Sequence, residues 1–427
     1  MKQIGSRAVS LLLMTLLIIV GALLFLVRYV EYGQDWAAAY ARENAGASGA
    51  LIDRNGVLLA SFSPSESAFQ PDRELRIANY HLTGDYYGRT GTGLLTGYQD
   101  FSLLTGIALS ENSVLYLNVD AELNRKAFTL LSGRAGAVLL MNYRTGEVLC
   151  MVSSPSIDPL EAEPQPGDGA YINRCLSASF VPGSVFKLIT AAAALEHIPD
   201  LMDRRFVCDG AVEIAGVEIV CSGHHGEQTF EQAMSNSCNV VFAQLAVELG
   251  YERMLRSARA FGFLDSQRLD GIATAAGSFP AEYPGDPELG WAGIGQSTDL
   301  VCPYSMLRFV AAIANDGELS RPRLIRDGSL GETSRLLPAE TARGLRRLMH
   351  YNVVNGYGED RFPGLRVCAK TGTAERGDGS SNAWFVGFLA DDQHPYAFVV
   401  MIERGGSGLN AAGSLANEIL QYAVLRQ

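Results

Sequence analysis

The stretch that most constrains the fold runs from Phe180 to His197 and reads FVPGSVFKLITAAAALEH. After Pro182 and Gly183 open the predicted helix, its residues are apolar or small on nearly every face, which is typical of a helix buried inside a domain. Lys187 lies in the first turn, where a buried ammonium costs free energy unless it is paired or deprotonated. The fold must therefore surround this lysine with a core and give it a specific partner.

Ser184 is the partner that the spacing indicates. Residues i and i+3 of a helix are neighbours, so the Lys187 amine can reach the Ser184 hydroxyl and act as its general base. Burial lowers a lysine pKa from about 10.4 by about 3–5 units, which frees the amine near pH 7. The alternative is a lysine that extends from the helix end to solvent. Only four of the 34 basic residues are lysines, and because arginine cannot act as a base, a lysine here favours catalysis.

The composition is that of a folded, acidic protein. The chain has 427 residues, of which 48% are hydrophobic, so it can form two or three domains and is not a disordered protein. Its formal net charge is −12 and it has no cluster of lysines and arginines. We therefore expect no nucleic-acid partner.

The N-terminus carries a candidate membrane anchor. Ala8 to Val27 is an uncharged run, and about 20 such residues span a bilayer as a helix. Lys2 and Arg7 precede it, which predicts a cytoplasmic N-terminus and an extracytoplasmic body. We therefore expect a single-pass protein of the cell membrane. A cleaved signal peptide is the alternative, but its apolar region is usually shorter, and the candidate cleavage site AAAYA at 37–41 lies far downstream.

The order of the predicted elements indicates an α+β fold. A strand hairpin at 136–154 is followed by a mainly helical segment, and strands return in RVCAKTGTAE, NAWFVGFLAD and YAFVVMIER before a final helix. Strands at both ends with helices between them predict one antiparallel sheet flanked by helices. We divide the chain into a cytoplasmic tip and transmembrane anchor at 1–28, a small mixed N-terminal domain of the pedestal or dimerisation type at 29–133, and the sheet-and-helix domain at 134–427.

A second polar segment, AMSNSCNVVF, interrupts a helical pattern. Alternation in an extended segment places Ser237 and Asn239 on the same side, where both can face a cleft. The alternative is that they are helix caps, which both residue types favour.

A third segment, AKTGTAE, lies on a predicted strand. Lys370 would supply a positive charge, Gly372 would leave room for a ligand along the strand, and the Thr373 N–H could donate to that ligand. The alternative is a β-turn with a solvated lysine.

Seven cysteines leave at least one thiol unpaired within the chain. CDGAVEIAGVEIVC predicts a hairpin turning at Ala215-Gly216, and it makes Cys208 and Cys221 the candidate disulfide of an extracytoplasmic domain. The same two cysteines with His225 and Cys238 are alternative metal ligands, although their spacings match no tight template.

The three polar segments together are far more specific than each alone. S-x-x-K at Ser184, S-x-N at Ser237 and K-T-G at Lys370 occur in the order found in penicillin-binding proteins and class A β-lactamases. The flanks extend the likeness: VPGSVFKLITAAAALE, SCNVVF, AGIGQ at 292–296, KTGTAE followed by AWFVGF, DRNG at 53–56, LNVDAELN at 117–124 and the segment 136–159. The chain resembles a class B penicillin-binding protein, a membrane-anchored D,D-transpeptidase. It departs at Ser48-Gly49, where Arg-Gly is common, and in its short N-terminal domain.

The resemblance implies an acyl-transfer mechanism. Ser184 would attack the carbonyl between two D-alanines of a peptidoglycan stem peptide, Lys187 would take the hydroxyl proton, and an amine of a neighbouring stem peptide would resolve the acyl-enzyme. The backbone N–H groups of Ser184 and Thr373 would form the oxyanion hole. Ser237 would relay a proton to the leaving amine, and Asn239 would orient Lys187 and the peptide.

The resemblance also implies the ligands and partners. Lys370, Thr371 and Thr373, with Gly372 between them, would bind the terminal carboxylate of the substrate or of a β-lactam. No metal or organic cofactor is implied for the reaction. The expected partners are stem peptides as D-Ala-D-Ala donor and amine acceptor, β-lactams and the membrane, and a membrane-embedded glycosyltransferase of the division or elongation type is a candidate.

Three alternatives remain open. A serine β-lactamase shares the motifs but needs an added base for fast deacylation, and no such residue is evident from spacing. A non-catalytic β-lactam-binding scaffold or sensor would not need every motif residue intact. A Ser-His-Asp hydrolase is disfavoured because no serine lies in G-x-S-x-G.

Overall fold

The computed structural model describes residues 13–27, 49–62, 67–85, 87–95, 113–161, 169–326 and 331–426. Residues 13–27 of the predicted anchor form a helix whose side chains are exposed. Among the described residues, no helix combines the length and the hydropathy needed to cross a bilayer. Residues 8–12 of the predicted anchor and the alternative cleavage site at 37–41 lie outside the described residues.

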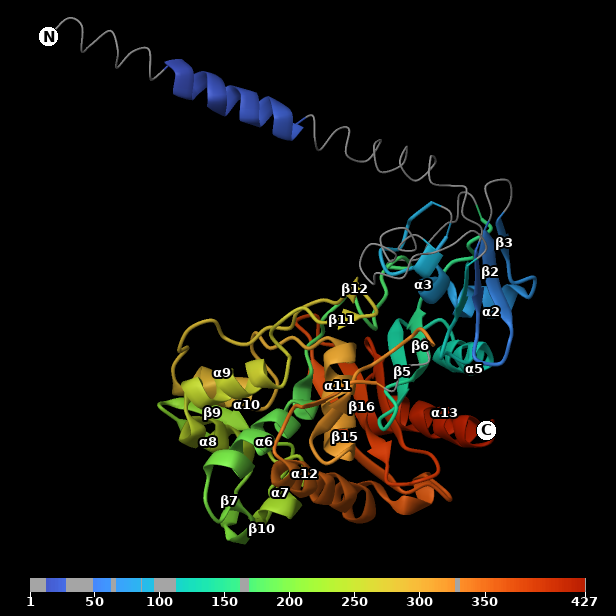
Figure 1. Cartoon of the computed structure of the whole chain (residues 1–427). Helices are drawn as coiled ribbons and strands as arrows, with labels where there is room; N and C mark the ends of the chain where they lie inside the picture. The colour runs from blue at the N-terminus through green and yellow to red at the C-terminus, as the bar shows by residue number, and fades with distance from the viewer. Residues whose placement is uncertain are drawn as a thin grey trace, which may run out of the picture.

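One five-stranded antiparallel sheet forms the centre of the C-terminal part, as predicted (Figure 1). Its order is β15-β16-β17-β5-β6, so strands from both ends of this part of the chain pair with each other. Nearly every residue of the inner strands is buried, because helices cover both faces. The strands are β5 (Gly136–Asn142), β6 (Val148–Ser154), β15 (Val367–Glu375), β16 (Ser381–Leu389) and β17 (Tyr396–Ile402).

Alternate residues of the strands belong to different cores. Leu139 and Met141 of β5 pack in one core, while Val138 and Leu140 pack in the other, as the two-residue period of a strand requires. The first core contains α6 (Lys187–His197) and α11 (Pro303–Ala314), and the second contains α5 (Ala121–Leu131) and α13 (Ser414–Val424). The helix α5 therefore packs on this sheet although it precedes the predicted boundary at 133/134, and that boundary stays a prediction.

The apolar helix α6 is buried on all sides, as its sequence predicted. Residues 187–194 are all buried, and α8, α9 and α12 surround the helix (Figure 1). The helices of this region are α7 (Phe230–Ser235), α8 (Asn239–Leu249), α9 (Tyr251–Ala260), α10 (Asp286–Gly293) and α12 (Ala339–Tyr351). The short helical elements of the C-terminal part are η1 (Gly183–Val185), η2 (Leu201–Asp203), η3 (Asn352–Tyr357), η4 (Glu359–Arg361) and η5 (Gly408–Gly413).

Short strands line the edge of the helical region. The predicted hairpin is confirmed as β8 (Ala211–Ile214) and β9 (Val217–Val220), with Ala215 and Gly216 both at positive φ, which matches the twist of a two-residue turn. The strand β7 (Arg205–Cys208) pairs instead with β10 (Gly226–Thr229). The remaining pairs are β11 (Arg268–Leu269) with β12 (Ile272–Ala273), and β13 (Glu318–Ser320) with β14 (Thr333–Arg335).

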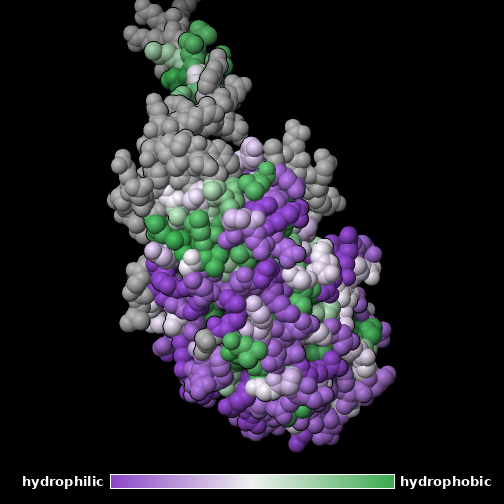
Figure 2. Space-filling view, turned by 90° about the vertical axis from the view of Figure 1, so that its right-hand side faces the viewer, coloured by the Kyte–Doolittle hydropathy of each residue, from purple (hydrophilic) through white to green (hydrophobic). Residues whose placement is uncertain are grey.

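A smaller sheet of order β3-β2-β1-β4 forms the N-terminal part, where β1 and β2 pair as an antiparallel hairpin around DRNG. Val114 and Tyr116 are exposed on one side of β4, whereas Leu115 between them is buried. Figure 2 shows hydrophobic residues gathered at this end of the molecule. The elements are β1 (Gly49–Ile52), β2 (Leu58–Phe62), β3 (Ser67–Phe69), β4 (Ser113–Tyr116), α2 (Arg73–Ala78) and α3 (Tyr80–Thr83).

Candidate active site

Ser184 lies in the turn η1, directly before α6, and this turn is pressed against β15. Gly183 has a φ of +55°, and a Cβ built there would lie 2.9 Å from the Ala374 Cα. Its N–H donates to the Gly295 carbonyl at 2.9 Å, within the AGIGQ segment. Only glycine adopts this positive φ without strain and also leaves room for Ala374 of the strand. Gly183 therefore sets the position of Ser184 relative to β15.

Lys187 is the first residue of α6, and its side chain is fully buried. Its Nζ lies 3.1 Å from the Ser184 Oγ and 2.7 Å from the Asn239 Oδ1. It also contacts both the carbonyl oxygen and the hydroxyl of Ser237, the latter at 3.2 Å. The structure therefore brings together four residues predicted from two distant segments.

These contacts determine where the N–H bonds and the lone pair of a neutral Lys187 amine are directed. The Ser237 carbonyl and the Asn239 amide oxygen can only accept, so two Lys187 N–H bonds are directed to them. A neutral amine then has one lone pair left, which faces the hydroxyls of Ser184 and Ser237. This is the geometry in which an amine accepts a serine proton.

Burial lowers the pKa of Lys187 to about 7, and the nearby thiols of Cys238 and Cys221 oppose this shift. An ordinary lysine would be almost entirely protonated at neutral pH. Lys187 therefore has a large neutral fraction at pH 7, the property that its apolar sequence context predicted.

Ser237 lies between α7 and α8, where the helical pattern breaks, and Asn239 is the first residue of α8. Ser237 has a φ of +52°, and the N-cap of α8 is Cys238, whose side chain makes no capping bond. The Asn239 Nδ2 donates to the Val220 carbonyl at 2.9 Å, and its N–H donates to the Cys221 Sγ at 3.2 Å. The alternative interpretation of these polar residues as helix caps is wrong, because their side chains turn to Lys187 and β9.

Lys370 approaches the same serine from β15. Its side chain is fully buried, and its Nζ lies 3.0 Å from the Ser237 Oγ and 3.0 Å from the Thr371 carbonyl. Burial, and then the charge of Lys187, hold the pKa of Lys370 well below its usual value. The β-turn alternative for this segment is wrong, since β15 is a regular strand paired with β16 over its length.

One edge of β15 pairs with β16, and the opposite edge pairs with no strand of this sheet and is called the free edge here. The Thr371 N–H donates to the Tyr357 hydroxyl at 3.0 Å, and residues two apart in a strand direct their N–H groups to the same side. The Thr373 N–H is therefore directed to this free edge, while its hydroxyl accepts the Gly408 N–H at 3.2 Å.

Gly372 has a packing role that the sequence did not suggest. A Cβ built there would lie 2.8 Å from the Pro182 carbonyl and 3.1 Å from the Val185 Cγ1. The missing side chain thus lets the turn with Ser184 approach the strand, and the room that Gly372 leaves for a ligand along the strand stays a prediction.

Tyr357 was not predicted from the sequence. Its hydroxyl lies 3.2 Å from the Thr371 Oγ1 and accepts the Thr371 N–H. It lies in η3, a turn with no motif of its own, so no pattern pointed to it.

The disulfide prediction for Cys208 and Cys221 is not supported, because all seven cysteines are free. Cys208 ends β7, which pairs with β10, and so it is not part of the β8–β9 hairpin. The alternative ligand set is gathered instead. We call it the Cys₃His cluster, and its members are Cys208, Cys221, His225 and Cys238, whose ligand atoms all lie within 4.8 Å of one another.

Comparison with known proteins settles the family. Residues 136–421 match the family model of the penicillin binding protein transpeptidase domain. The chain belongs to this family. As a penicillin-binding protein it is similar to the stage V sporulation protein D of Bacillus subtilis, with 31% identity over 66% of this chain and 47% of that protein. It is also similar to the peptidoglycan D,D-transpeptidase PbpA of Mycobacterium tuberculosis, with 30% identity over 68% of this chain and 66% of PbpA.

Solved structures share the fold. A D,D-transpeptidase domain of a peptidoglycan glycosyltransferase from Eggerthella lenta superposes with a TM-score of 0.76 at 26% identity, over 89% of this chain and 99% of that one. The imipenem acyl-enzyme of M. tuberculosis penicillin-binding protein A gives a TM-score of 0.75 at 22% identity, over 90% and 99%. The chain spans about half to two thirds of the length of the curated relatives.

Proposed function

We propose that this penicillin-binding protein is a D,D-transpeptidase that cross-links peptidoglycan stem peptides through an acyl-enzyme at Ser184. The observation that carries the proposal is the buried amine of Lys187, which contacts Ser184, Ser237 and Asn239 at once. A relative at 30% identity is a peptidoglycan D,D-transpeptidase, which supports this substrate class.

Acylation begins when the Ser184 Oγ forms a bond with the carbonyl carbon between two D-alanines. Lys187 accepts the hydroxyl proton, and the C–N bond to the terminal D-alanine breaks as its amine is protonated. Ser237 hydrogen-bonds both Lys187 and Lys370, so its hydroxyl is the path by which that proton reaches the leaving amine.

The developing oxyanion needs preorganised donors. The N–H of Ser184, in the turn η1, and the N–H of Thr373, on the free edge of β15, are the pair that fits. Removing one such donor costs about 3–4 kcal/mol of transition-state stabilisation in other acyl-transfer enzymes.

The substrate is positioned by the polar groups around this pair. Lys370, Thr371 and Thr373 bind the terminal carboxylate, and Asn239 orients Lys187 and the peptide. An amine of a second stem peptide then attacks the ester carbon, its proton passes to the Ser184 oxygen as that bond breaks, and the cross-link forms.

β-Lactams present a similar carboxylate and a strained amide, so they acylate Ser184 and inhibit the enzyme. A structural neighbour forms an imipenem acyl-enzyme, which supports this expectation. A β-lactamase would need a carboxylate that directs a hydrolytic water. In the hydrogen bonds of the described residues, no carboxylate joins Ser184 or Lys187, which favours a long-lived adduct.

The location of the protein is part of the proposal. Residues 8–27 act as a single-pass anchor with the N-terminus in the cytoplasm, residues 29–133 hold the catalytic part away from the membrane, and residues 134–427 carry the reaction. The uncharged run and the preceding Lys2 and Arg7 support this topology. A membrane-embedded glycosyltransferase is the candidate partner that would supply glycan strands.

The test uses the full chain in detergent with a peptide ending in D-Ala-D-Ala and an amine acceptor. We expect mass spectrometry to detect free D-alanine and the cross-linked product, and both to disappear in Ser184→Ala. Ser179→Ala is the matched control, since this nearby hydroxyl bonds only the Ala276 carbonyl among the contacts described. Product formed by Ser184→Ala at the wild-type rate would refute the proposal.

A further inference from the structure

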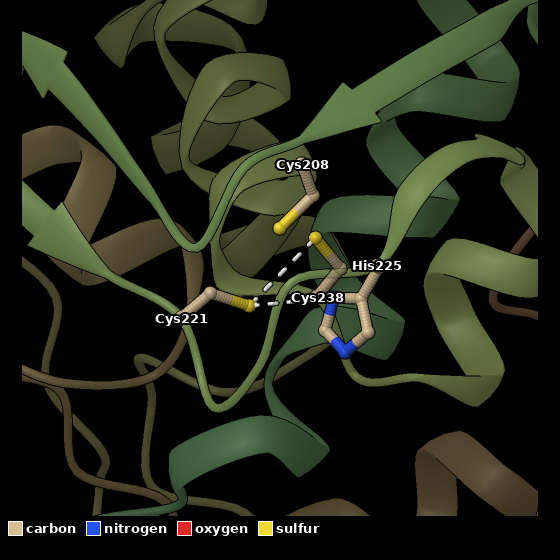
Figure 3. Close-up of side chains that lie close together, drawn as sticks. All are labelled: Cys208, Cys221, His225 and Cys238. Atoms are coloured by element: carbon tan, nitrogen blue, oxygen red, sulfur yellow. Dashed lines mark hydrogen bonds between the residues drawn. The ribbon is translucent and has the colours of Figure 1, made fainter.

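The Cys₃His cluster adjoins the candidate active site, because its member Cys238 lies between Ser237 and Asn239 in the chain. Its members come from four segments: the end of β7, the residue after β9, the residue before β10 and the N-cap of α8 (Figure 3). The three cysteines are buried and His225 is half-buried. Backbone hydrogen bonds fix the segments, since the Cys221 N–H donates to Gly210 and the His225 N–H donates to Cys208.

The distances within the cluster fit a tetrahedral ion. The Cys221 Sγ lies 3.8 Å from the Cys238 Sγ and 3.6 Å from the His225 Nδ1. Ligands about 2.3 Å from a tetrahedral Zn²⁺ are about 3.8 Å from one another. Figure 3 shows the three sulfur atoms and the imidazole directed to a common centre.

The surroundings are those of thiolate ligands. The Asn239 N–H donates to the Cys221 Sγ at 3.2 Å, and the Gln228 Nε2 donates to the Cys238 Sγ at 3.2 Å. Gln228 is itself buried, so its amide is held in place. Such N–H donors orient metal-bound thiolates and stabilise their charge.

We propose that the Cys₃His cluster binds one Zn²⁺ ion, which holds Ser237 and Asn239 in contact with Lys187. Three thiols release their protons on binding and the imidazole binds as a neutral ligand, so the site carries a net charge of about −1. Cys238 lies between Ser237 and Asn239 in the chain, and Ser237 has a strained φ of +52°. An ion bound to Cys238 and Cys221 fixes the backbone of the segment from Ser237 to Asn239.

Zinc content tests the site itself. The purified full chain, loaded with Zn²⁺ and desalted, should retain about one zinc per chain by plasma mass spectrometry. Cys208→Ser and Cys221→Ser should lose most of it. Cys302→Ser is the matched control, because this buried cysteine lies outside the cluster at the N-cap of α11, a position that suits serine.

A second measurement uses the wild-type protein alone, so its result does not depend on whether a variant folds. Wild-type protein loaded with Co²⁺ should show thiolate charge-transfer bands and the visible bands of a tetrahedral site. Wild-type protein that retains no zinc and shows no such bands would overturn the proposal. So would an intact mass two hydrogens lower with a disulfide mapped inside the cluster.

The positioning effect rests on the proposed function and is tested separately. Removal of zinc with a chelator should lower the rate constant of acylation by a fluorescent penicillin at least about tenfold, with little change in the affinity of the initial complex, and zinc should restore it. Equal acylation rates with and without zinc would overturn the positioning role. Zinc bound at one per chain in a protein that no penicillin acylates would refute the proposed function and leave the metal site intact.

Discussion

Lys187→Arg separates the charge of this residue from its ability to accept a proton. Both side chains are cationic when protonated, but an arginine with a pKa above about 12 has a neutral fraction below about 10⁻⁴ at pH 8. Lys187, with its pKa lowered to about 7 by burial, is mostly neutral at that pH. The fraction of protein with a competent base therefore falls by more than about 10³-fold in the variant.

General-base catalysis contributes about 10²–10⁴-fold to a rate, and we expect acylation by penicillin to slow by that amount. Stopped-flow or gel-based labelling with a fluorescent penicillin at pH 8 measures the rate. The matched control is Lys126→Arg, since Lys126 is partly exposed and pairs with Glu418 away from Ser184. Circular dichroism should show that both variants remain folded. Acylation of Lys187→Arg within about threefold of the wild type would refute the general-base assignment.

Three further predictions concern the same site. The wild-type acylation rate should rise with pH around a midpoint near 7, because the reactive form of Lys187 is the deprotonated one; a rate that falls across pH 6–8 would contradict this. Tyr357→Phe leaves the Thr371 N–H without its partner and should lower the free energy of unfolding by about 1–3 kcal/mol in a denaturant titration, whereas an unchanged midpoint would exclude the bond as a stabilising one. Gly372→Ala places a Cβ 2.8 Å from the Pro182 carbonyl and should slow acylation at least about tenfold in a folded protein, and a wild-type rate would show that the turn adapts freely.

The reaction centre could be predicted from the sequence because its residues lie in short patterns. Ser184 and Lys187 are one helical turn apart, and Lys370 belongs to the K-T-G motif on a predicted strand. The central antiparallel sheet followed from strands at both ends of the segment. Each of these inferences uses contacts that are local in the chain or enforced by burial.

What the sequence could not show depends on contacts between distant segments. Tyr357 reaches Thr371 through η3, whose residues carry no motif. Gly372 faces the turn before α6, a contact that strand periodicity alone does not identify. The Cys₃His cluster has wide ligand spacings, so no template selected it, and only the pairing of β7 with β10 brings Cys208 to the other ligands.

Covalent labelling of Ser184 tests the central claim most directly. The full chain is incubated with penicillin G, and intact mass and peptide mapping locate and follow the adduct. We predict one penicilloyl group per chain on the peptide containing Ser184, lost only over minutes to hours, and no adduct in Ser184→Ala. An adduct on another residue, or one that hydrolyses within seconds, would contradict a transpeptidase with Ser184 as its nucleophile.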